Sequence, residues 1–246
     1  MILNLLGSGM SAGEIFIELL LLIPTLLLSF SLHECAHAYA ADRMGDHTAK
    51  NFGRLTLNPL KHLDPIGTIG MLLLGIGWAK PVPINARYFK NPKKGMALSA
   101  LAGPLSNLIL ALIAVVGYQI TNRLSLKTDL GGIYSLNFSA FKDMGAPFTL
   151  LMAMVAMSLF SLMAWMNISL CIFNLIPIPP FDGSRIAFAL LPDKIYWGMM
   201  KYERYIMIGL LVLLFLGNRI GFSPISGITG AVLNLFYKLT NWIVVL

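Results

Sequence analysis

Apolar runs long enough to cross a bilayer restrict the fold of this chain more than any other property. A transmembrane helix needs about 20 consecutive apolar residues. The main apolar runs cover residues 14–44, 95–121, 147–177, 205–216 and 224–246. With 57% hydrophobic and only 12% charged residues, the chain is too apolar for a soluble domain. We therefore expect an all-α polytopic membrane protein with about five to six transmembrane helices, folded as a single domain over residues 1–246.

The basic residues are distributed unevenly among the segments between these runs. Of the 18 Lys and Arg residues, nine lie in 43–94 and four in 185–204, whereas only three lie in 122–146. Cytoplasmic segments of membrane proteins carry an excess of Lys and Arg. The pattern therefore places 43–94 and 185–204 in the cytoplasm and the N-terminus outside. It also accounts for the net charge of +7 without a nucleic-acid partner.

The first run contains the sequence His-Glu-Cys-Ala-His at residues 33–37. Residues four apart lie on one face of a helix, so His33 and His37 can direct two imidazoles at one metal ion. Glu34 borders that face and could accept a proton from a water molecule. This spacing is the HExxH pattern of zinc peptidases. Ionisable side chains at membrane depth cost about 2.5–3.5 kcal/mol each, which favours a functional role for the group.

A shorter apolar run at residues 66–78 holds four glycines and has basic segments on both sides. A single crossing by this run would place its basic flanks on opposite faces of the membrane, against the charge pattern. We therefore expect a re-entrant segment that enters and leaves on the same face, packed against protein that satisfies its backbone. The sequence Pro81-Val82-Pro83-Ile84 that follows alternates in character, so a β-hairpin is one form open to the segment.

A catalytic zinc usually has three protein ligands and an open position, so the two histidines need a third partner. The extended HExxHxxGxxH pattern fails because its last ligand position is Arg43, and the only later glutamate, Glu203, lies in a basic segment. His47 and His62 lie in a polar stretch after the first run, and we expect them to be exposed loop residues. Three aspartates of this region suit N-cap or turn roles: Asp42, Asp46 and Asp64.

Asp182 follows the third long run, at a point where Pro177, Pro179 and Pro180 prevent a regular helix. We expect a proline-broken helix there, with the chain unwound next to the aspartate. An unpaired carboxylate in this position would be costly, and Zn²⁺ would compensate its charge. The alternative role is an N-cap for a short helix that starts at Gly183. The missing third ligand of the two-histidine group favours Asp182 as a metal ligand.

Three motifs, in this order, resemble the site-2 proteases, zinc enzymes that cut peptide bonds within membranes. They are His-Glu-Cys-Ala-His at 33–37, Gly-Pro-Leu-Ser-Asn at 103–107, and Asn174 with Pro177 and Asp182-Gly183. The stretch 45–67 is similar to the compact prokaryotic branch of this family. The similarity covers roughly residues 20–190. We expect neither the PDZ module nor the CBS domains of other members, because the segment between the second and third runs is short and the last run is apolar.

The resemblance implies one Zn²⁺ per chain, bound by His33, His37 and Asp182, with Glu34 as the general base. It implies a zinc metalloendopeptidase that hydrolyses peptide bonds in or near transmembrane segments of membrane proteins, as in regulated intramembrane proteolysis. The expected partners are the lipid bilayer and transmembrane substrates, without nucleic acid. The expected location is the bacterial inner membrane, which the chain spans several times with its active site toward the cytoplasmic side.

Two asparagines and the stretch after the short glycine-containing run also have expected roles. Asn174 matches a family position that stabilises the oxyanion, so the resemblance implies a catalytic role for it. Its amide could equally bind backbone groups that Pro177 frees. Asn107 is expected to form a hydrogen bond between helices rather than to act in catalysis. Because a substrate helix must unwind before hydrolysis, the strand with Val82 and Ile84 could hold the extended substrate by β-strand addition.

Two other functions are compatible with histidine and aspartate at membrane depth. A membrane metal transporter or zinc-binding channel would not need Glu34 between its histidines and would be expected to show a repeated half, which this sequence lacks. An inactive scaffold with a structural zinc would hold the ion with four protein ligands and would not need Glu34 either. A transporter should keep much of its flux when Glu34 is replaced by Gln, whereas a protease should lose its activity.

Overall fold

Helices make up nearly all of the regular structure in the part of the chain that the structure describes. The computed structural model describes residues 11–74, 79–127, 148–192 and 224–245, together with single positions between 194 and 209. These residues contain no β-strand beyond one isolated bridge. Three helices are long and apolar enough to cross a membrane: α2 (Ala12–Arg43), α5 (Pro92–Lys127) and α7 (Phe148–Asn174). They confirm an all-α membrane protein and coincide with the first three predicted spans.

The predicted spans at 205–216 and 224–246 have different outcomes. Most of the first one, including all of 210–216, lies outside the described residues. The second forms two shorter helices, α11 (Pro224–Thr240) and α12 (Trp242–Val245), which are separated at Asn241. The total of about five to six transmembrane helices therefore stays a prediction.

α2 begins at a capping box and continues without a break through residues 33–37. The Ser11 hydroxyl accepts a hydrogen bond from the Glu14 amide (3.3 Å), and Glu14 Oε2 accepts one from the Ser11 amide (2.8 Å). These bonds satisfy donors that the start of a helix otherwise leaves free. The helix includes Pro24 within its length. Its buried face has residues at four-residue intervals: Thr25, Ser29, His33, His37 and Ala41.

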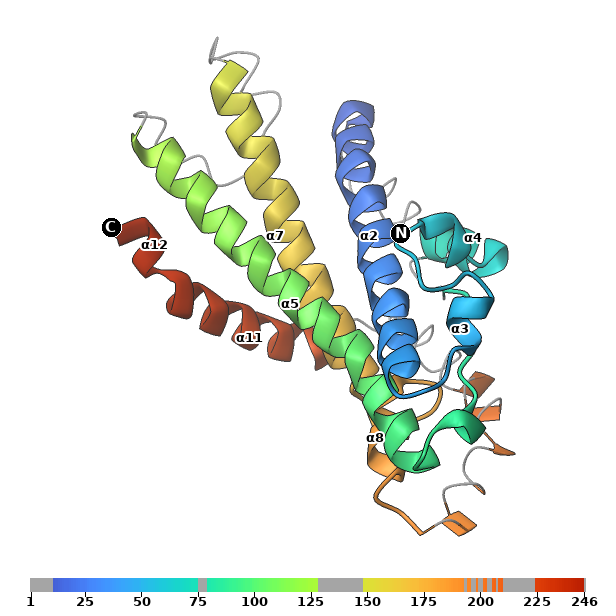
Figure 1. Ribbon diagram of the computed structural model, residues 1–246. Helices are drawn as coiled ribbons and strands as arrows, with labels where there is room; N and C mark the ends of the chain where they lie inside the picture. Colours follow the sequence, from blue (N-terminus) through green and yellow to red (C-terminus); the bar gives the residue numbers. More distant parts are fainter. Residues whose placement is uncertain are drawn as a thin grey trace.

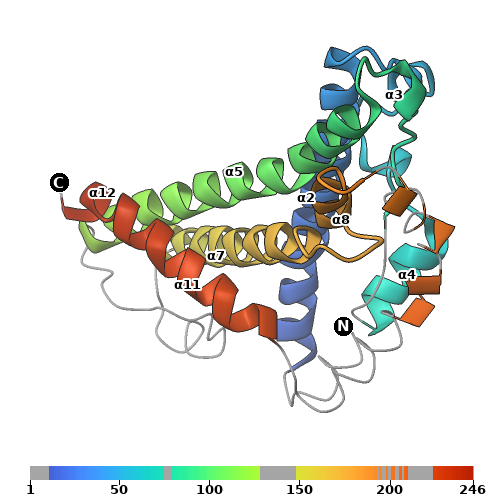
Figure 2. The ribbon, with the colours of Figure 1, turned by 90° about the horizontal axis from the view of Figure 1, so that it is seen from below.

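α5 and α7 lie side by side because small residues bring the two helices close together (Figures 1 and 2). Ala111, Ala114 and Ala164 are almost completely buried. A Cβ at Gly117 would lie 2.7 Å from the Phe160 ring, so this ring packs where only glycine leaves room. Small residues at helix interfaces are typical of membrane proteins. α2 meets this pair near its own C-terminal end (Figure 1).

α11 packs across α5 and α7 on the side away from α4 (Figure 2). Leu233, Phe236 and Tyr237 of α11 pack against the cluster of buried residues that includes Ala114 and Ala164. A polar contact adds to this packing, since the hydroxyl oxygens of Ser169 and Thr229 lie 3.2 Å apart. α5 and α7 are thereby covered on two sides, by α2 and by α11.

The segment predicted to be re-entrant begins as a helix. Residues Pro65–Leu74 form α4, and the Asp64 carboxylate accepts a hydrogen bond from the Gly67 amide in its first turn (2.8 Å). Asp64 therefore has the predicted helix-capping role. The β-hairpin alternative is wrong for these residues, because a helix satisfies its own backbone groups in an apolar environment whereas a hairpin leaves open edges.

The chain returns beside the point from which α4 departs. Leu63 and Ala79 form an isolated antiparallel bridge, and the Lys80 amide donates to the His62 carbonyl (2.8 Å). Between α2 and α4 the polar stretch forms two short helices, α3 (Thr48–Asn51) and η1 (Pro59–Lys61). After Ala79 the chain continues without regular secondary structure to η2 (Ala86–Tyr88), just before α5, and its last residue before η2, Asn85, is extended.

Candidate metal centre

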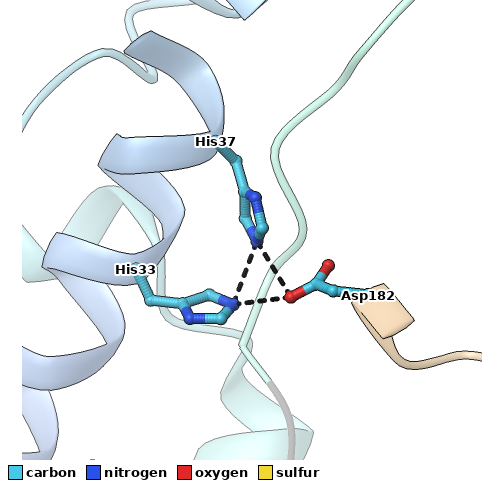
Figure 3. Close-up of side chains that lie close together, drawn as sticks. All are labelled: His33, His37 and Asp182. Carbon is cyan, nitrogen blue, oxygen red and sulfur yellow. Dashed lines mark hydrogen bonds and ion pairs between the residues drawn. The ribbon is translucent and has the colours of Figure 1, made fainter. Parts of the chain in front are cut away.

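Two histidines of α2 meet at one point on its buried face (Figure 3). His33 and His37 are each 6% exposed. Their Nε2 atoms lie 3.0 Å apart, and their rings are almost perpendicular, with an angle of 89° between the planes. One helical turn separates the two residues, as the four-residue spacing predicts. The sequence therefore places two nitrogen ligands side by side.

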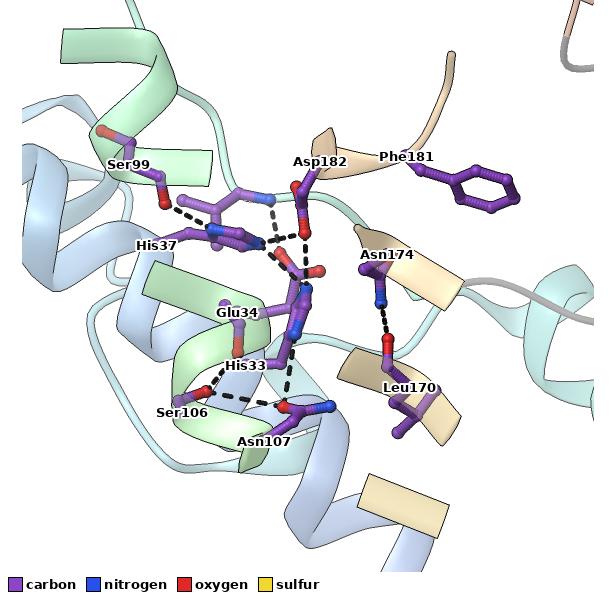
Figure 4. A network of polar contacts seen from close by, with 12 residues as sticks. His33, Glu34, His37, Ser99, Ser106, Asn107, Leu170, Asn174, Phe181 and Asp182 are labelled. Carbon is purple, nitrogen blue, oxygen red and sulfur yellow. Dashed lines mark hydrogen bonds and ion pairs between the residues drawn. The ribbon is translucent and has the colours of Figure 1, made fainter. Parts of the chain in front are cut away.

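One face of α5 orients both imidazole rings (Figure 4). His37 Nδ1 lies 2.7 Å from the Ser99 carbonyl oxygen, and His33 Nδ1 lies 3.3 Å from Asn107 Oδ1. Because both partners are acceptors, each Nδ1 carries the proton and each Nε2 keeps a free lone pair. Hydrogen bonds of this kind fix the tautomer of metal-binding histidines. Asn107 thus forms the predicted bond between helices, and its partner is a candidate ligand.

Gly103 lies between Ser99 and Asn107 on the same face of α5. A Cβ at this position would lie 2.4 Å from His37 Nε2 and 2.6 Å from His33 Cε1. Glycine is therefore the residue that lets α5 approach both rings closely enough to hold them. Ser99 and Gly103 were not among the predicted site residues. The feature of the sequence that could have indicated their role is the four-residue spacing of Ser99, Gly103 and Asn107, which places them on one face of a helix.

Replacement of Gly103 by alanine is expected to push the imidazole rings apart. We expect Gly103→Ala to lower both zinc affinity and proteolysis by about 10- to 100-fold, the usual effect of disturbing groups that orient metal ligands. Zinc bound per chain in the purified protein measures the first effect. Gly230→Ala in α11 is the matched control, because a Cβ there meets nothing within 4 Å. Wild-type zinc affinity in Gly103→Ala would contradict this role.

Asp182 reaches the two histidines because the chain folds back sharply after α7. α8 (Asp182–Phe188) starts at this aspartate, and its N-cap is Phe181. A Cβ at Gly183 would lie 2.2 Å from the Leu175 carbonyl oxygen, so this close return requires glycine. The Phe181 ring packs on Phe173 at the end of α7, with 4.3 Å between ring centroids. The predicted break of the helix is confirmed, and the alternative role of Asp182 as N-cap is wrong.

The carboxylate of Asp182 completes a cluster of three ligand-type atoms (Figure 3). Asp182 Oδ2 lies 3.1 Å from His33 Nε2 and 3.3 Å from His37 Nε2. Around a tetrahedral zinc ion with ligands at about 2.0–2.1 Å, neighbouring ligand atoms lie about 3.3–3.4 Å apart. The two distances from Asp182 Oδ2 are close to this spacing. In the described part of the chain, this is the one group of three or more His, Cys, Asp or Glu residues arranged for a metal ion.

The chemistry of these three atoms requires a cation between them. Asp182 Oδ2 is buried and has no hydrogen-bond donor among the described residues. Each Nε2 presents a lone pair, so the three atoms repel one another unless a proton or a metal ion lies among them. A metal ion would bind this carboxylate in its ionised form.

Glu34 lies beside this cluster and is held by a backbone amide (Figure 4). Its side chain is buried, and Oε2 accepts a hydrogen bond from the Val82 amide (2.9 Å). Oε1 has no hydrogen bond in the described residues, which leaves it available for a proton. The Val82 amide was not predicted as a partner of Glu34.

The remaining candidate residues differ in their surroundings. Asn174 ends α7, and its side-chain amide donates to the Leu170 carbonyl of the same helix (3.0 Å). This carbonyl lies one turn before the one that Pro177 frees, so the predicted bond to a freed carbonyl is not the one that forms.

His47 is exposed, as predicted, and pairs with Asp42 at 2.6 Å. His62 is only 1% exposed, so its prediction as an exposed loop residue is wrong. The loop folds over its ring, and Nε2 lies 2.8 Å from the Thr56 carbonyl oxygen.

The sequence is similar to a family of peptidases and to several bacterial proteins. Residues 21–216 match the model of peptidase family M50. YwhC of Bacillus subtilis, provisionally named a zinc metalloprotease, is 39% identical over 87% of this chain and 90% of that protein. Rip2 of Mycobacterium tuberculosis, also provisionally named a zinc metalloprotease, is 27% identical over 76% of this chain and 63% of that protein. No solved structure gives a significant match.

Proposed function

Because this chain belongs to peptidase family M50, we propose that it is a membrane zinc metalloprotease that hydrolyses peptide bonds in or near transmembrane segments of other membrane proteins. The family match confirms the resemblance to the site-2 proteases. The observation that carries the proposal is the convergence of three buried ligand-type atoms, from His33, His37 and Asp182, directly beside the carboxylate of Glu34.

Each residue of the centre has one task in this proposal. His33, His37 and Asp182 would hold the metal ion through Nε2, Nε2 and Oδ2. When bound, Zn²⁺ polarises a carbonyl oxygen and lowers the pKa of water toward about 7. Glu34 takes the proton of the attacking water on Oε1 and delivers it to the leaving amine, while Oε2 stays bound to the Val82 amide.

The proposed orientation places the centre toward the cytoplasmic side of a bacterial inner membrane. Its support is a contact between described residues of the two basic segments, 43–94 and 185–204. Lys93 of the first segment donates to the Leu191 carbonyl of the second.

α4 is proposed to be re-entrant, because the bridge between Leu63 and Ala79 brings both ends of its segment together. The packing of α2 and of α11 on α5 and α7 supports the proposed single domain over residues 1–246.

Asn174 is proposed to stabilise the oxyanion. One N–H of its amide is bound to the Leu170 carbonyl, and the other remains available. The residue ends α7, eight residues before Asp182, on the side of the network where the chain folds back (Figure 4). The bond to Leu170 fixes the direction of the amide, which is what a preorganised donor requires.

The segment with Val82 and Ile84 is proposed to bind an unwound substrate. The Val82 amide is occupied by Glu34, and Pro81 and Pro83 have no N–H. The Ile84 amide is the donor left for a substrate carbonyl, since it has no hydrogen bond in the described residues. Strand addition depends on such main-chain bonds.

Replacement of Ile84 by proline is expected to weaken substrate binding. Removal of one hydrogen bond worth about 0.5–1.5 kcal/mol should raise KM by up to about tenfold, with unchanged zinc content. The measurement is cleavage rate against substrate concentration in liposomes. Ile84→Val is the matched control because it keeps the amide and most of the side chain. Equal KM values for Ile84→Pro and Ile84→Val would rule out strand addition at this amide.

The experiment that tests the proposed function compares wild type and Glu34→Gln in liposomes with a single-span protein substrate. Cleavage of the substrate and entry of zinc into the liposomes are followed in parallel. A protease cleaves the substrate, loses this activity in the variant and transports no zinc. A metal transporter carries zinc across the membrane, keeps much of that flux in the variant and leaves the substrate intact.

A further inference from the structure

The segment at residues 79–85 is fixed at both ends and touches Glu34 in the middle. Near its start, the Lys80 amide donates to the His62 carbonyl (2.8 Å). Near its end, the Asn85 amide donates to Asp46 Oδ2 (2.6 Å). Between these points the Val82 amide donates to Glu34 Oε2. The position of the Val82 amide therefore depends on the two contacts that hold the segment.

Asp46 is placed rigidly relative to α2, the helix that carries Glu34. The Asp46 amide donates to the Ala41 carbonyl (3.0 Å) and the Gly45 amide donates to the Asp42 carbonyl (3.2 Å). With a φ of +104° at Gly45, these bonds form a Schellman motif that ends the helix. The motif fixes the backbone of Asp46 about three turns beyond Glu34.

The side chain of Asp46 is completely buried and uses both of its oxygens. Oδ1 accepts hydrogen bonds from the amide and the hydroxyl of Thr48. Oδ2 accepts the hydrogen bond from the Asn85 amide. A carboxylate can accept on both sides at once, whereas an asparagine side chain offers one acceptor oxygen and one donor group. The arrangement therefore requires an acidic residue and not merely a polar one.

We propose that Asp46 is a positioning residue for Glu34. It holds the 79–85 segment so that the Val82 amide binds Glu34 Oε2 and leaves Oε1 directed to the reacting water. The proposal rests on the proposed function, because it assigns the proton transfer to Glu34. Asp46 itself contacts neither the candidate ligands nor Glu34, and it acts through Asn85 and Val82.

Asp46→Asn is the variant that tests this role, with the purified full chain and a single-span substrate in liposomes. The expected result is a kcat lower by about 10- to 100-fold, since small displacements of a catalytic group have effects of this size. Zinc bound per chain should stay within about twofold of wild type, because the metal ligands are untouched. Asp42→Asn is the matched control, because Asp42 pairs with His47 and Lys50 outside the centre.

A double-mutant cycle separates positioning from a general effect on folding. Val82→Pro removes the amide that binds Glu34 and is expected to lower kcat as Asp46→Asn does. If Asp46 acts through that amide, the effects of the two substitutions should not add. The kcat of the double variant should then lie within about twofold of the kcat of the slower single variant. A double variant whose loss equals the product of the two single losses would overturn the proposal.

Hydrogen exchange of the peptide that covers residues 79–86 provides a readout that does not depend on activity. Asp46→Asn should speed exchange at the Val82 and Asn85 amides, and Asp42→Asn should not. Unchanged exchange in Asp46→Asn overturns the proposal whatever the activity. Faster exchange with unchanged kcat overturns the positioning role but leaves the proposed function intact. A wild-type chain that cleaves no substrate, with normal zinc content, overturns the proposed function itself.

Discussion

Glu34→Gln is expected to abolish cleavage of membrane-protein substrates while zinc stays bound. Glutamine has the shape of glutamate, and its side-chain oxygen can still accept the hydrogen bond from the Val82 amide. It cannot take a proton from water at neutral pH. Loss of a general base typically lowers the rate by about 10²- to 10⁴-fold. The measurement is kcat in liposomes, with zinc content determined on the same preparation.

The zinc content is the control for this variant. His33, His37 and Asp182 are unchanged in Glu34→Gln, so each chain should bind as much zinc as wild type. Loss of both zinc and activity would mean that Glu34 helps to form the metal site. Full zinc content together with wild-type cleavage would contradict the assignment of Glu34 as general base.

Asp182→Asn is expected to release the metal ion and with it the activity. The substitution keeps the size of the side chain but removes the negative charge that lies 3.1 Å from His33 Nε2 and 3.3 Å from His37 Nε2. Changes in groups that merely support a ligand cost about 10- to 100-fold in metal affinity, so loss of a ligand should cost more than about 100-fold. Zinc per chain after dialysis measures this effect directly.

Chelation supplies the matching experiment on the unaltered chain. Removal of zinc from wild type should stop cleavage, and added zinc should restore it, whereas Asp182→Asn should not recover at the same zinc concentration. Asp42→Asn controls for the loss of a negative charge near α2, because Asp42 lies in an exposed ion pair. A dialysed Asp182→Asn protein with one zinc per chain would remove Asp182 from the ligand set.

The sequence predicts the candidate centre well where side chains carry the chemistry. Imidazoles and carboxylates bind metals, and the four-residue spacing of His33 and His37 specifies a common helix face. Asp182 could be found because a carboxylate near membrane depth needs a partner. The structure brings all three together, and their role as ligands remains a proposal that the zinc measurements decide.

Backbone groups and close approaches could not be predicted in the same way. The Ser99 carbonyl would be present with any side chain at position 99. The Val82 amide would be present with any residue except proline at position 82. Gly103 has no chemistry of its own, and its role follows from the 2.4 Å that would separate a Cβ from His37. The burial of His62 likewise depends on how a loop folds over it.

The fold could be predicted where apolar runs are long and continuous. α2, α5 and α7 follow from their length and composition alone. The short glycine-containing run before Val82 was ambiguous, because a short apolar segment fits a helix or a strand equally well. The structure starts this segment with α4 and closes it with a single bridge, between Leu63 and Ala79.

The mass of the products is the most direct test of metal-dependent cleavage by this chain. A single-span substrate is incubated in liposomes with wild type or Glu34→Gln, both loaded with zinc, and the products are identified by mass spectrometry. The proposed function predicts two fragments from wild type, whose masses add up to the substrate plus one water and whose new ends lie in or near the transmembrane segment. It predicts none from Glu34→Gln. Intact substrate with zinc-loaded wild type, or the same fragments from Glu34→Gln, would contradict it.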